Sequence, residues 1–221
     1  MSDLPVHRRA SNWEKHNEAG VAALNQGNYA QAEKELLSAL LEAETVETGD
    51  PLCLATSLHN LAGLYRAQGK FAEAEPLLKR SLTIKEQTLG AEHTALTTSL
   101  NNLAGIYCAQ SRYGEAEPLL TRSLALLENT LGPEHIELVV SLNNLAAVYC
   151  SESRYALAEP LYRRILAIQE RTLGPEHPNV AASLENWAAL LRETNRESQA
   201  AELEERARAI RARQPESGLV Q

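Results

Sequence analysis

The chain has 221 residues, of which 29 are acidic and 21 basic, giving a formal net charge of −8. This acidic balance argues against a nucleic-acid-binding protein, which normally carries a basic face. No uncharged apolar stretch approaches the roughly 20 residues that span a bilayer, and the first residues lack the apolar segment of a secretory signal. Aromatic residues make up only 5%, so the core must consist mainly of Leu, Ala, Ile and Val, which favours helices. We therefore expect a helical cytoplasmic protein that does not bind membranes.

Both ends of the chain are poor in apolar residues. Residues 1–12 and 214–221 have too few apolar side chains to pack firmly, and we expect both segments to be disordered tails. The region between them, residues 13–213, is expected to form the folded domain.

A Ser-Leu pair recurs every 42 residues along this domain, as Ser57-Leu58, Ser99-Leu100, Ser141-Leu142 and Ser183-Leu184. Residues 99–140 and 141–182 share 25 identities over 42 positions without a gap. Such self-similarity at a fixed period predicts a solenoid in which each repeat packs only on its neighbours. We count five repeats, at about 13–50, 51–92, 93–134, 135–176 and 177–213.

Each repeat contains two helical patterns. In residues 57–98 the first apolar stripe, spaced i, i+3, i+4 and i+7, consists of Leu58, Leu61, Ala62 and Tyr65. Gly69 follows in a turn and suits the left-handed conformation that closes a helix. A second stripe begins at Ala74 and ends near Leu89-Gly90. The repeat is therefore predicted to be a helical hairpin.

This pattern resembles the tetratricopeptide repeat. The matching positions in residues 57–98 are Leu58, Leu61, Ala62, Tyr65, Ala74, Leu78 and Ser81. The usual repeat has 34 residues, whereas this 42-residue form, with Leu-Asn-Asn-Leu-Ala and Leu-Gly-Pro-Glu-His, resembles the repeats of kinesin light chains and similar bacterial proteins. The resemblance covers about residues 13–213. It implies an all-α, right-handed superhelical solenoid of about five stacked antiparallel hairpins.

The resemblance also implies a binding surface, because the first helix of each hairpin lines the concave side in this family. Columns of amides and small residues recur on these helices. The candidate groove residues are Asn17, His59, Asn60, Gly63, Arg66, Asn101, Asn102, Gly105, Asn143, Asn144, Ala147, Asn186 and Arg192. Small side chains admit a partner's backbone, and amides both donate and accept hydrogen bonds. We predict an adaptor or scaffold that binds an extended peptide segment of a protein partner, whose identity the sequence does not reveal.

Two alternatives remain open. The asparagines can instead be copies inherited by duplication that link neighbouring helices as an inter-repeat ladder. The column that contains Asn60 and Asn102 lies nearer the seam between helices, which favours a structural role there. The second alternative is a structural scaffold that associates with itself through its edges or convex surfaces.

Arg80, Arg122, Arg164 and Arg206 form a column on the second helices. It is either a basic strip for acidic peptide side chains or an exposed row of salt bridges. The glutamates five residues earlier, Glu75, Glu117 and Glu159, are the predicted partners. We favour the salt-bridge row, whose pairs contribute below about 1 kcal/mol each.

The Glu-His pairs in the exit loops, Glu92-His93, Glu134-His135 and Glu176-His177, suggest metal ligands at first sight. One Glu and one His per loop fall short of the three or four convergent ligands of a zinc site. We therefore expect these residues to cap the following helix, as Asp50-Pro51 would in the earlier loop. No metal or cofactor is expected.

Cys53, Cys108 and Cys150 are expected to be reduced thiols, since residues one repeat apart are too distant for a disulfide. Cys108 or Cys150 paired with His59 would be the basis of a thiol-dependent enzyme. The sequence has no phosphate-binding glycine loop, nucleophile elbow or zinc-protease helix. We therefore expect no enzymatic activity.

Overall fold

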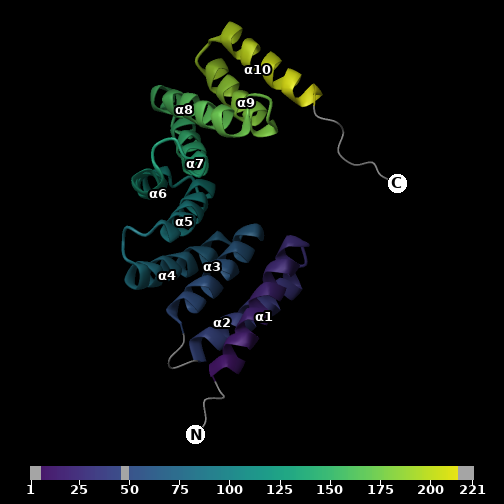
Figure 1. Ribbon diagram of the computed structural model, residues 1–221, viewed down its shortest axis with the longest axis vertical. Helices are drawn as coiled ribbons and strands as arrows, with labels where there is room; N and C mark the ends of the chain where they lie inside the picture. The colour runs from purple at the N-terminus through teal and green to yellow at the C-terminus, as the bar shows by residue number, and fades with distance from the viewer. Residues whose placement is uncertain (1–5, 46–49, 214–221) are drawn as a thin grey trace, which may run out of the picture. The chain divides into compact units, whose positions relative to one another are not determined.

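The computed structural model describes residues 6–45 and 50–213, with side chains from residue 12 onward (Figure 1). Every regular element in these ranges is helical. In chain order they are α1 (Val6–Asn25), α2 (Tyr29–Thr45), α3 (Pro51–Ala67), α4 (Phe71–Leu89), the short 3-10 helix η1 (Thr94–Leu96), α5 (Thr97–Ala109), α6 (Tyr113–Leu131), α7 (Leu138–Ser151), α8 (Tyr155–Leu173), α9 (Pro178–Glu193) and α10 (Glu197–Ala212). The predicted all-α class is confirmed.

The predicted tails lie mostly outside the described residues. Residues 1–5 and 214–221 are not described, so disordered ends stay a prediction there. Within the predicted N-terminal tail, however, α1 already begins at Val6. The residues that follow Val6 include two arginines and an alanine, which are strong helix formers that an apolar pattern does not register.

The helices form two compact parts, Met1–Leu119 and Leu120–Gln221, and α6 runs from one into the other. In the N-terminal part each helix from α1 to α5 packs against the next, and α1 also contacts α3. In the C-terminal part α7 packs against α8, α8 against α9, and α9 against α10. This pattern of neighbour-only packing is that of a repeat solenoid.

The core of each part consists of leucines and alanines at the predicted positions. In the N-terminal part, one cluster joins Ala23 on α1, Leu36 on α2 and Leu61 on α3. A buried hydrogen bond, in which Ser81 Oγ donates to the carbonyl of Ala55 at 2.6 Å, ties α4 to α3. In the C-terminal part, a second cluster joins residues of α7 and α8, with Leu142, Ala158 and Ile165 fully buried.

The turn inside each hairpin requires a left-handed residue. Gly69 adopts φ 73° there, as predicted, but the equivalent positions in the later repeats hold Ser111, Ser153 and Asn195 at φ 58–59°. Non-glycine residues pay a steric cost of about 1–2 kcal/mol in this region. The later repeats therefore carry local strain that the earlier ones avoid.

Replacing Ser153 with glycine is expected to raise the free energy of unfolding by about 0.5–1 kcal/mol. The substitution relieves the left-handed strain, and the greater flexibility of the unfolded chain offsets part of that gain. Urea denaturation followed by circular dichroism measures the effect. Ser151→Gly, in the last turn of α7, is the matched control and should give no gain, since glycine disfavours a helix.

Each loop between hairpins contains a side chain that accepts a hydrogen bond from the backbone nitrogen two residues further on. Asp50 accepts a hydrogen bond from the backbone nitrogen of Leu52 at 2.9 Å. The Nδ1 atoms of His93, His135 and His177 accept backbone hydrogen bonds in the same way, at 3.1, 3.3 and 3.1 Å. The predicted capping of the next first helix is confirmed for Asp50 and His177, which are the N-caps of α3 and α9. His93 instead caps η1, and His135 binds the backbone nitrogen of Glu137 just before α7, whose N-cap makes no side-chain capping bond.

Candidate functional site

The predicted site residues all lie on first helices of hairpins. Helix α1 carries Asn17; α3 carries His59, Asn60, Gly63 and Arg66; α5 carries Asn101, Asn102 and Gly105; α7 carries Asn143, Asn144 and Ala147; and α9 carries Asn186 and Arg192. At 100° per residue, the four residues of α3 fall within about 120° of the helix circumference. Each first helix therefore offers these residues on one face, which we call the first-helix face.

In the N-terminal part, two of the candidate asparagines, Asn60 and Asn102, bridge neighbouring first helices. Asn60 Nδ2 on α3 donates to Asn17 Oδ1 on α1 at 2.8 Å. Asn102 Nδ2 on α5 lies 3.0 Å from His59 Nε2 on α3. Both bonds link a hairpin to the preceding one, so the inter-repeat ladder exists at these positions. The amides of Asn60 and Asn102 are thus partly engaged within the chain.

His59 has one ring nitrogen without a hydrogen-bond partner among the described residues. Burial, together with the nearby charges of Lys85 and Arg66, lowers the pKa of His59 to about 4, so the imidazole is neutral at physiological pH. Since the Asn102 amide donates to Nε2, the imidazole proton is assigned to Nδ1. This Nδ1 is buried and has no hydrogen-bond partner in the described part of the chain.

Two glycines keep the first-helix face of the N-terminal part open. A Cβ atom on Gly63 would meet no atom within 4 Å, and one on Gly105 would meet only Arg66 Nη1, at 3.9 Å. Internal packing therefore requires neither glycine. Both lie inside helices, where glycine costs about 1 kcal/mol relative to alanine. Glycine at such positions is typical of places where another backbone approaches closely.

In the C-terminal part the equivalent amides are not bridged. Asn143 Oδ1 on α7 is buried without a hydrogen-bond partner, and Asn186 on α9 is exposed. Among the residues from 120 to 213, no hydrogen bond joins these two amides. Asn186 also lines a shallow hollow with Cys150 and Tyr162. Of these two residues, the exposed Asn186 is the one whose amide a partner chain can reach.

The two predicted arginines differ in their engagement. Arg192 donates from Nε and Nη2 to the two carboxylate oxygens of Glu204, each at 2.8 Å, and Nη1 lies 3.0 Å from Glu197. These hydrogen bonds hold the pKa of the Glu204 carboxyl below its ordinary value. Arg66 is exposed and forms no ion pair with the residues that the structure describes. Arg66 is thus the better candidate to contact a partner.

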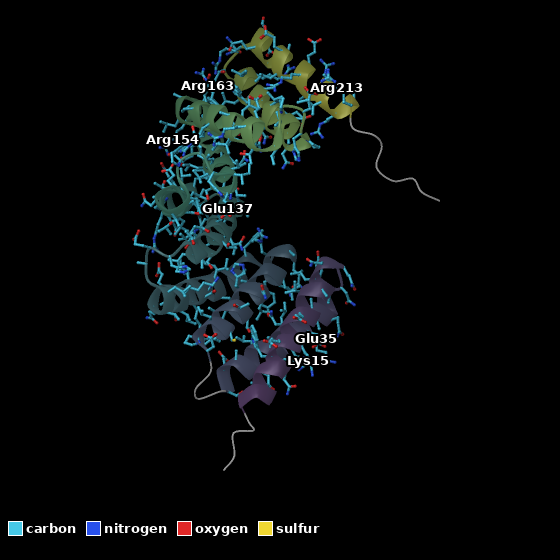
Figure 2. All side chains as sticks on the ribbon, viewed as in Figure 1. Lys15, Glu35, Glu137, Arg154, Arg163 and Arg213 are labelled. Atoms are coloured by element: carbon cyan, nitrogen blue, oxygen red, sulfur yellow. The ribbon has the colours of Figure 1, made fainter. Side chains whose placement is uncertain are left out.

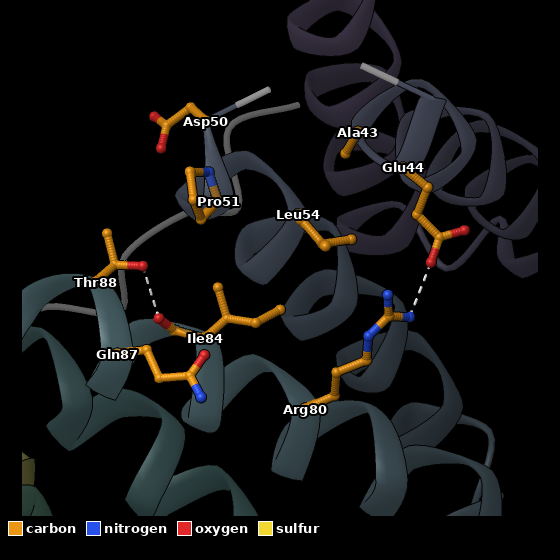
Figure 3. A pocket seen from close by; sticks show the side chains of 9 residues that line it. All are labelled: Ala43, Glu44, Asp50, Pro51, Leu54, Arg80, Ile84, Gln87 and Thr88. Carbon is orange, nitrogen blue, oxygen red and sulfur yellow. Dashed lines mark hydrogen bonds and ion pairs between the residues drawn. The ribbon is translucent and has the colours of Figure 1, made fainter. Parts of the chain in front are cut away.

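The arginine column on the second helices is a row of ion pairs between hairpins. Arg80 Nη1 on α4 lies 2.8 Å from Glu44 Oε1 on α2, at the edge of a surface hollow (Figure 3). The equivalent pairs in the C-terminal part, both at 2.5 Å, are Arg164–Glu128 and Arg206–Glu170. The salt-bridge interpretation is confirmed at these three arginines.

For Arg80 and Arg164 the predicted partners were wrong. Glu75 and Glu159 lie five residues before Arg80 and Arg164, which places them about 140° away around the same helix. They instead bind basic residues in the turn of the following hairpin. Glu159 pairs with Arg196, in the turn before α10, at 2.7 Å. It also pairs at 2.5 Å with Arg163 of its own helix α8, which is labelled in Figure 2.

This contact, which we call the turn clasp, joins a glutamate of one second helix to a basic turn residue of the next hairpin. In the N-terminal part, Arg112 Nη1 lies 2.6 Å from Glu75 Oε2, and the Arg112 guanidinium stacks 4.2 Å from the centre of the Tyr107 ring. Hydrogen bonds from Arg112 and Lys79 lower the pKa of Glu75 to about 2. Helical spacing alone did not predict the clasp because its partners are 37 residues apart, although both recur every 42 residues.

The glutamates of two exit loops also bind arginines. Glu134 pairs with Arg171 and Glu176 with Arg213. Across the described ranges, no three His, Cys, Asp or Glu side chains come together as a metal site would require. None of the described helices is both long and apolar enough to cross a membrane.

The three cysteines are free thiols, as predicted. Burial is the main cause that raises the pKa of each of them, Cys53, Cys108 and Cys150. A nucleophilic thiol requires the opposite shift. The geometry therefore gives no support to the hypothesis of a thiol-dependent enzyme.

The helical hairpins, packed on their neighbours within each part of the chain, form an all-α repeat solenoid. Two family models of the tetratricopeptide repeat match the chain, one at residues 54–95 and the other at residues 95–152 and 137–213. The chain therefore belongs to the tetratricopeptide repeat family, a fold that generally serves as a non-catalytic protein-interaction module.

Solved structures support this assignment. A putative kinesin light chain from Podosopora anserina with nearly identical TPR-like repeats is 31% identical, with 92% of this chain and 97% of that chain covered and a TM-score of 0.78. BtubC (BKLC) from P. vanneervenii is 23% identical over 94% of this chain and 86% of that one, with a TM-score of 0.81. The resemblance to kinesin light chain repeats is thus confirmed.

A more distant structure shows the fold alone. Aspartyl phosphate phosphatase F from Bacillus subtilis is 16% identical, with 93% of this chain and 52% of that chain covered and a TM-score of 0.78. Among curated proteins, no sequence matches the chain.

Proposed function

We propose that the chain is an adaptor or scaffold that binds an extended peptide segment of a partner protein along its first-helix faces. The open surface at Gly63 and Gly105 is the observation that carries the proposal, because two mid-helix glycines serve no packing role in the chain itself. The backbone N–H and C=O groups of an extended peptide need hydrogen-bond partners. Glycine has no side chain, so the peptide backbone can come close to the helix at these two positions.

Polar groups on the first helices of each part support this proposal. In the N-terminal part Arg66 is exposed, and in the C-terminal part the Asn186 amide is exposed and can both donate to and accept from a peptide backbone. Arg66 is available for an acidic or carbonyl group of the ligand. Hydrogen bonds from these groups to a peptide would add affinity and orient the bound segment.

Filling the open surface tests the proposal. The double variant Gly63→Leu/Gly105→Leu is expected to fold normally, since leucine favours a helix and both positions leave room for a larger side chain. Binding to peptides selected from a displayed random library should fall at least tenfold, as measured by isothermal titration calorimetry.

The matched control is Gly114→Leu. Gly114 also has no atom within 4 Å of a built Cβ, but it lies on the second helix α6, away from the first-helix face. The control should bind like the wild type. Equal affinity of the double variant and the wild type for every selected peptide would contradict the proposal.

A further inference from the structure

The outward face of α2 carries an apolar pair that the packing of the chain does not use. Leu37 and Leu41 are 44% and 63% exposed and lie one turn apart. Among the described residues, they are the only large exposed apolar side chains separated by a single turn of one helix. Isolated exposed leucines are ordinary, but an adjacent pair forms a patch that can be covered by another surface.

The later repeats show that the fold does not need leucines at these positions. The residues equivalent to Leu37 on the other second helices are Lys79, Thr121, Arg163 and Glu205, and those equivalent to Leu41 are Thr83, Ala125, Ala167 and Ala209. Polar or small side chains thus suffice at these positions in the other repeats. The leucine pair is particular to α2.

Charged residues flank the leucines in a self-complementary order. Lys34 lies three residues before Leu37, and Glu44 lies three residues after Leu41. At 100° per residue, all four fall within about 80° of one another around α2. Lys34 forms no ion pair with other described residues, and Glu44 uses Oε1 for Arg80 (Figure 3).

We propose that two copies of the chain associate through this face, with their α2 helices antiparallel. A two-fold axis that crosses α2 between Leu37 and Leu41 sets Leu37 of one copy against the partner's Leu41. The same axis sets Lys34 against the partner's Glu44, twice per dimer. An isologous interface requires this kind of self-complementarity, and the charge order selects an antiparallel arrangement over a parallel one, which would set like charges together.

The contact involves one helix per copy, so it is smaller than a standard stable interface and gives a weak, concentration-dependent dimer. Sedimentation velocity over a wide concentration range measures it. Leu37→Lys/Leu41→Lys should leave the chain monomeric at all concentrations. Leu157→Lys, which changes a leucine of α8 that is 45% exposed, is the matched control and should associate like the wild type.

Charge reversal tests the antiparallel order. Lys34→Glu places a second carboxylate against the partner's Glu44, and Glu44→Lys places a second ammonium group against the partner's Lys34. Each single variant should weaken the dimer about tenfold. An equimolar mixture of the two variants restores attractive pairing and should associate as the wild type does. Circular dichroism checks that each variant keeps its helices.

A wild type that stays monomeric at every concentration overturns the proposal. It is also overturned if Leu157→Lys reduces association as much as the double lysine variant does. Failure of the mixed charge variants to associate overturns the antiparallel order. Since none of these residues lies on the first-helix face, all outcomes are independent of peptide binding.

Discussion

Replacing Leu142 with alanine is expected to lower the free energy of unfolding by about 2–5 kcal/mol. Leu142 is fully buried on α7 and packs in the cluster that contains Leu138, Ala158 and Ile165. Truncation leaves a cavity that packed helices fill only in part. The equivalent leucines of the repeats before and after, Leu100 and Leu184, are also fully buried, so this position belongs to the core of each of these three hairpins.

Urea denaturation followed by circular dichroism measures the loss. Val140→Ala is the matched control, because Val140 lies two residues away on the same helix and is 58% exposed. The control should change the unfolding free energy by no more than about 0.5 kcal/mol. An equal loss for both variants would contradict the assigned burial of Leu142.

Replacing Glu75 with glutamine is expected to destabilise the protein at neutral pH and to matter less as the pH falls. In the folded chain, Arg112 and Lys79 lower the pKa of Glu75 to about 2, against an ordinary value of 4.5. A carboxyl with a lowered pKa stabilises the fold fully above its unfolded pKa, and that stabilisation is lost as the pH falls through the folded pKa. The difference between wild type and variant should therefore be complete above about pH 4.5 and vanish near pH 2.

We expect this difference to be about 1 kcal/mol at neutral pH, since the ion pairs of the clasp are partly exposed to solvent. Thermal denaturation at a series of pH values measures it. Glu73→Gln, which removes a neighbouring exposed glutamate of α4 outside the clasp, is the control and should show a smaller effect. A Glu75→Gln loss that is unchanged between neutral pH and a pH near the folded pKa would contradict the role of the clasp.

Much of the fold was predictable because the repeat multiplies each local signal. The 42-residue period, the apolar stripes and the glycine turns place the helix boundaries, and Leu58 and Leu142 are buried as their spacing indicates. The start of α1 at Val6 was not predictable in this way, because it depends on helix-forming residues without an apolar stripe.

The candidate site was predictable as a set of columns but not as a set of contacts. Helical periodicity places Asn60 and Asn102 on the first helices, yet only coordinates show that they bond to Asn17 and His59. The same limit explains the error over Glu75, since a pairing between hairpins depends on how the helices stack. Sequence spacing within one helix contains no information about that stacking.

The ion pairs between hairpins have a consequence for how such a chain can change its length. Because their spacing is fixed relative to the repeat, deletion of residues 141–182 would bring Arg206 opposite Glu128 and Arg213 opposite Glu134. These are the glutamates now held by Arg164 and Arg171. A gene encoding this array can therefore gain or lose a whole 42-residue segment while these arginines still face a glutamate. Evolution can thus change the number of repeats in whole units.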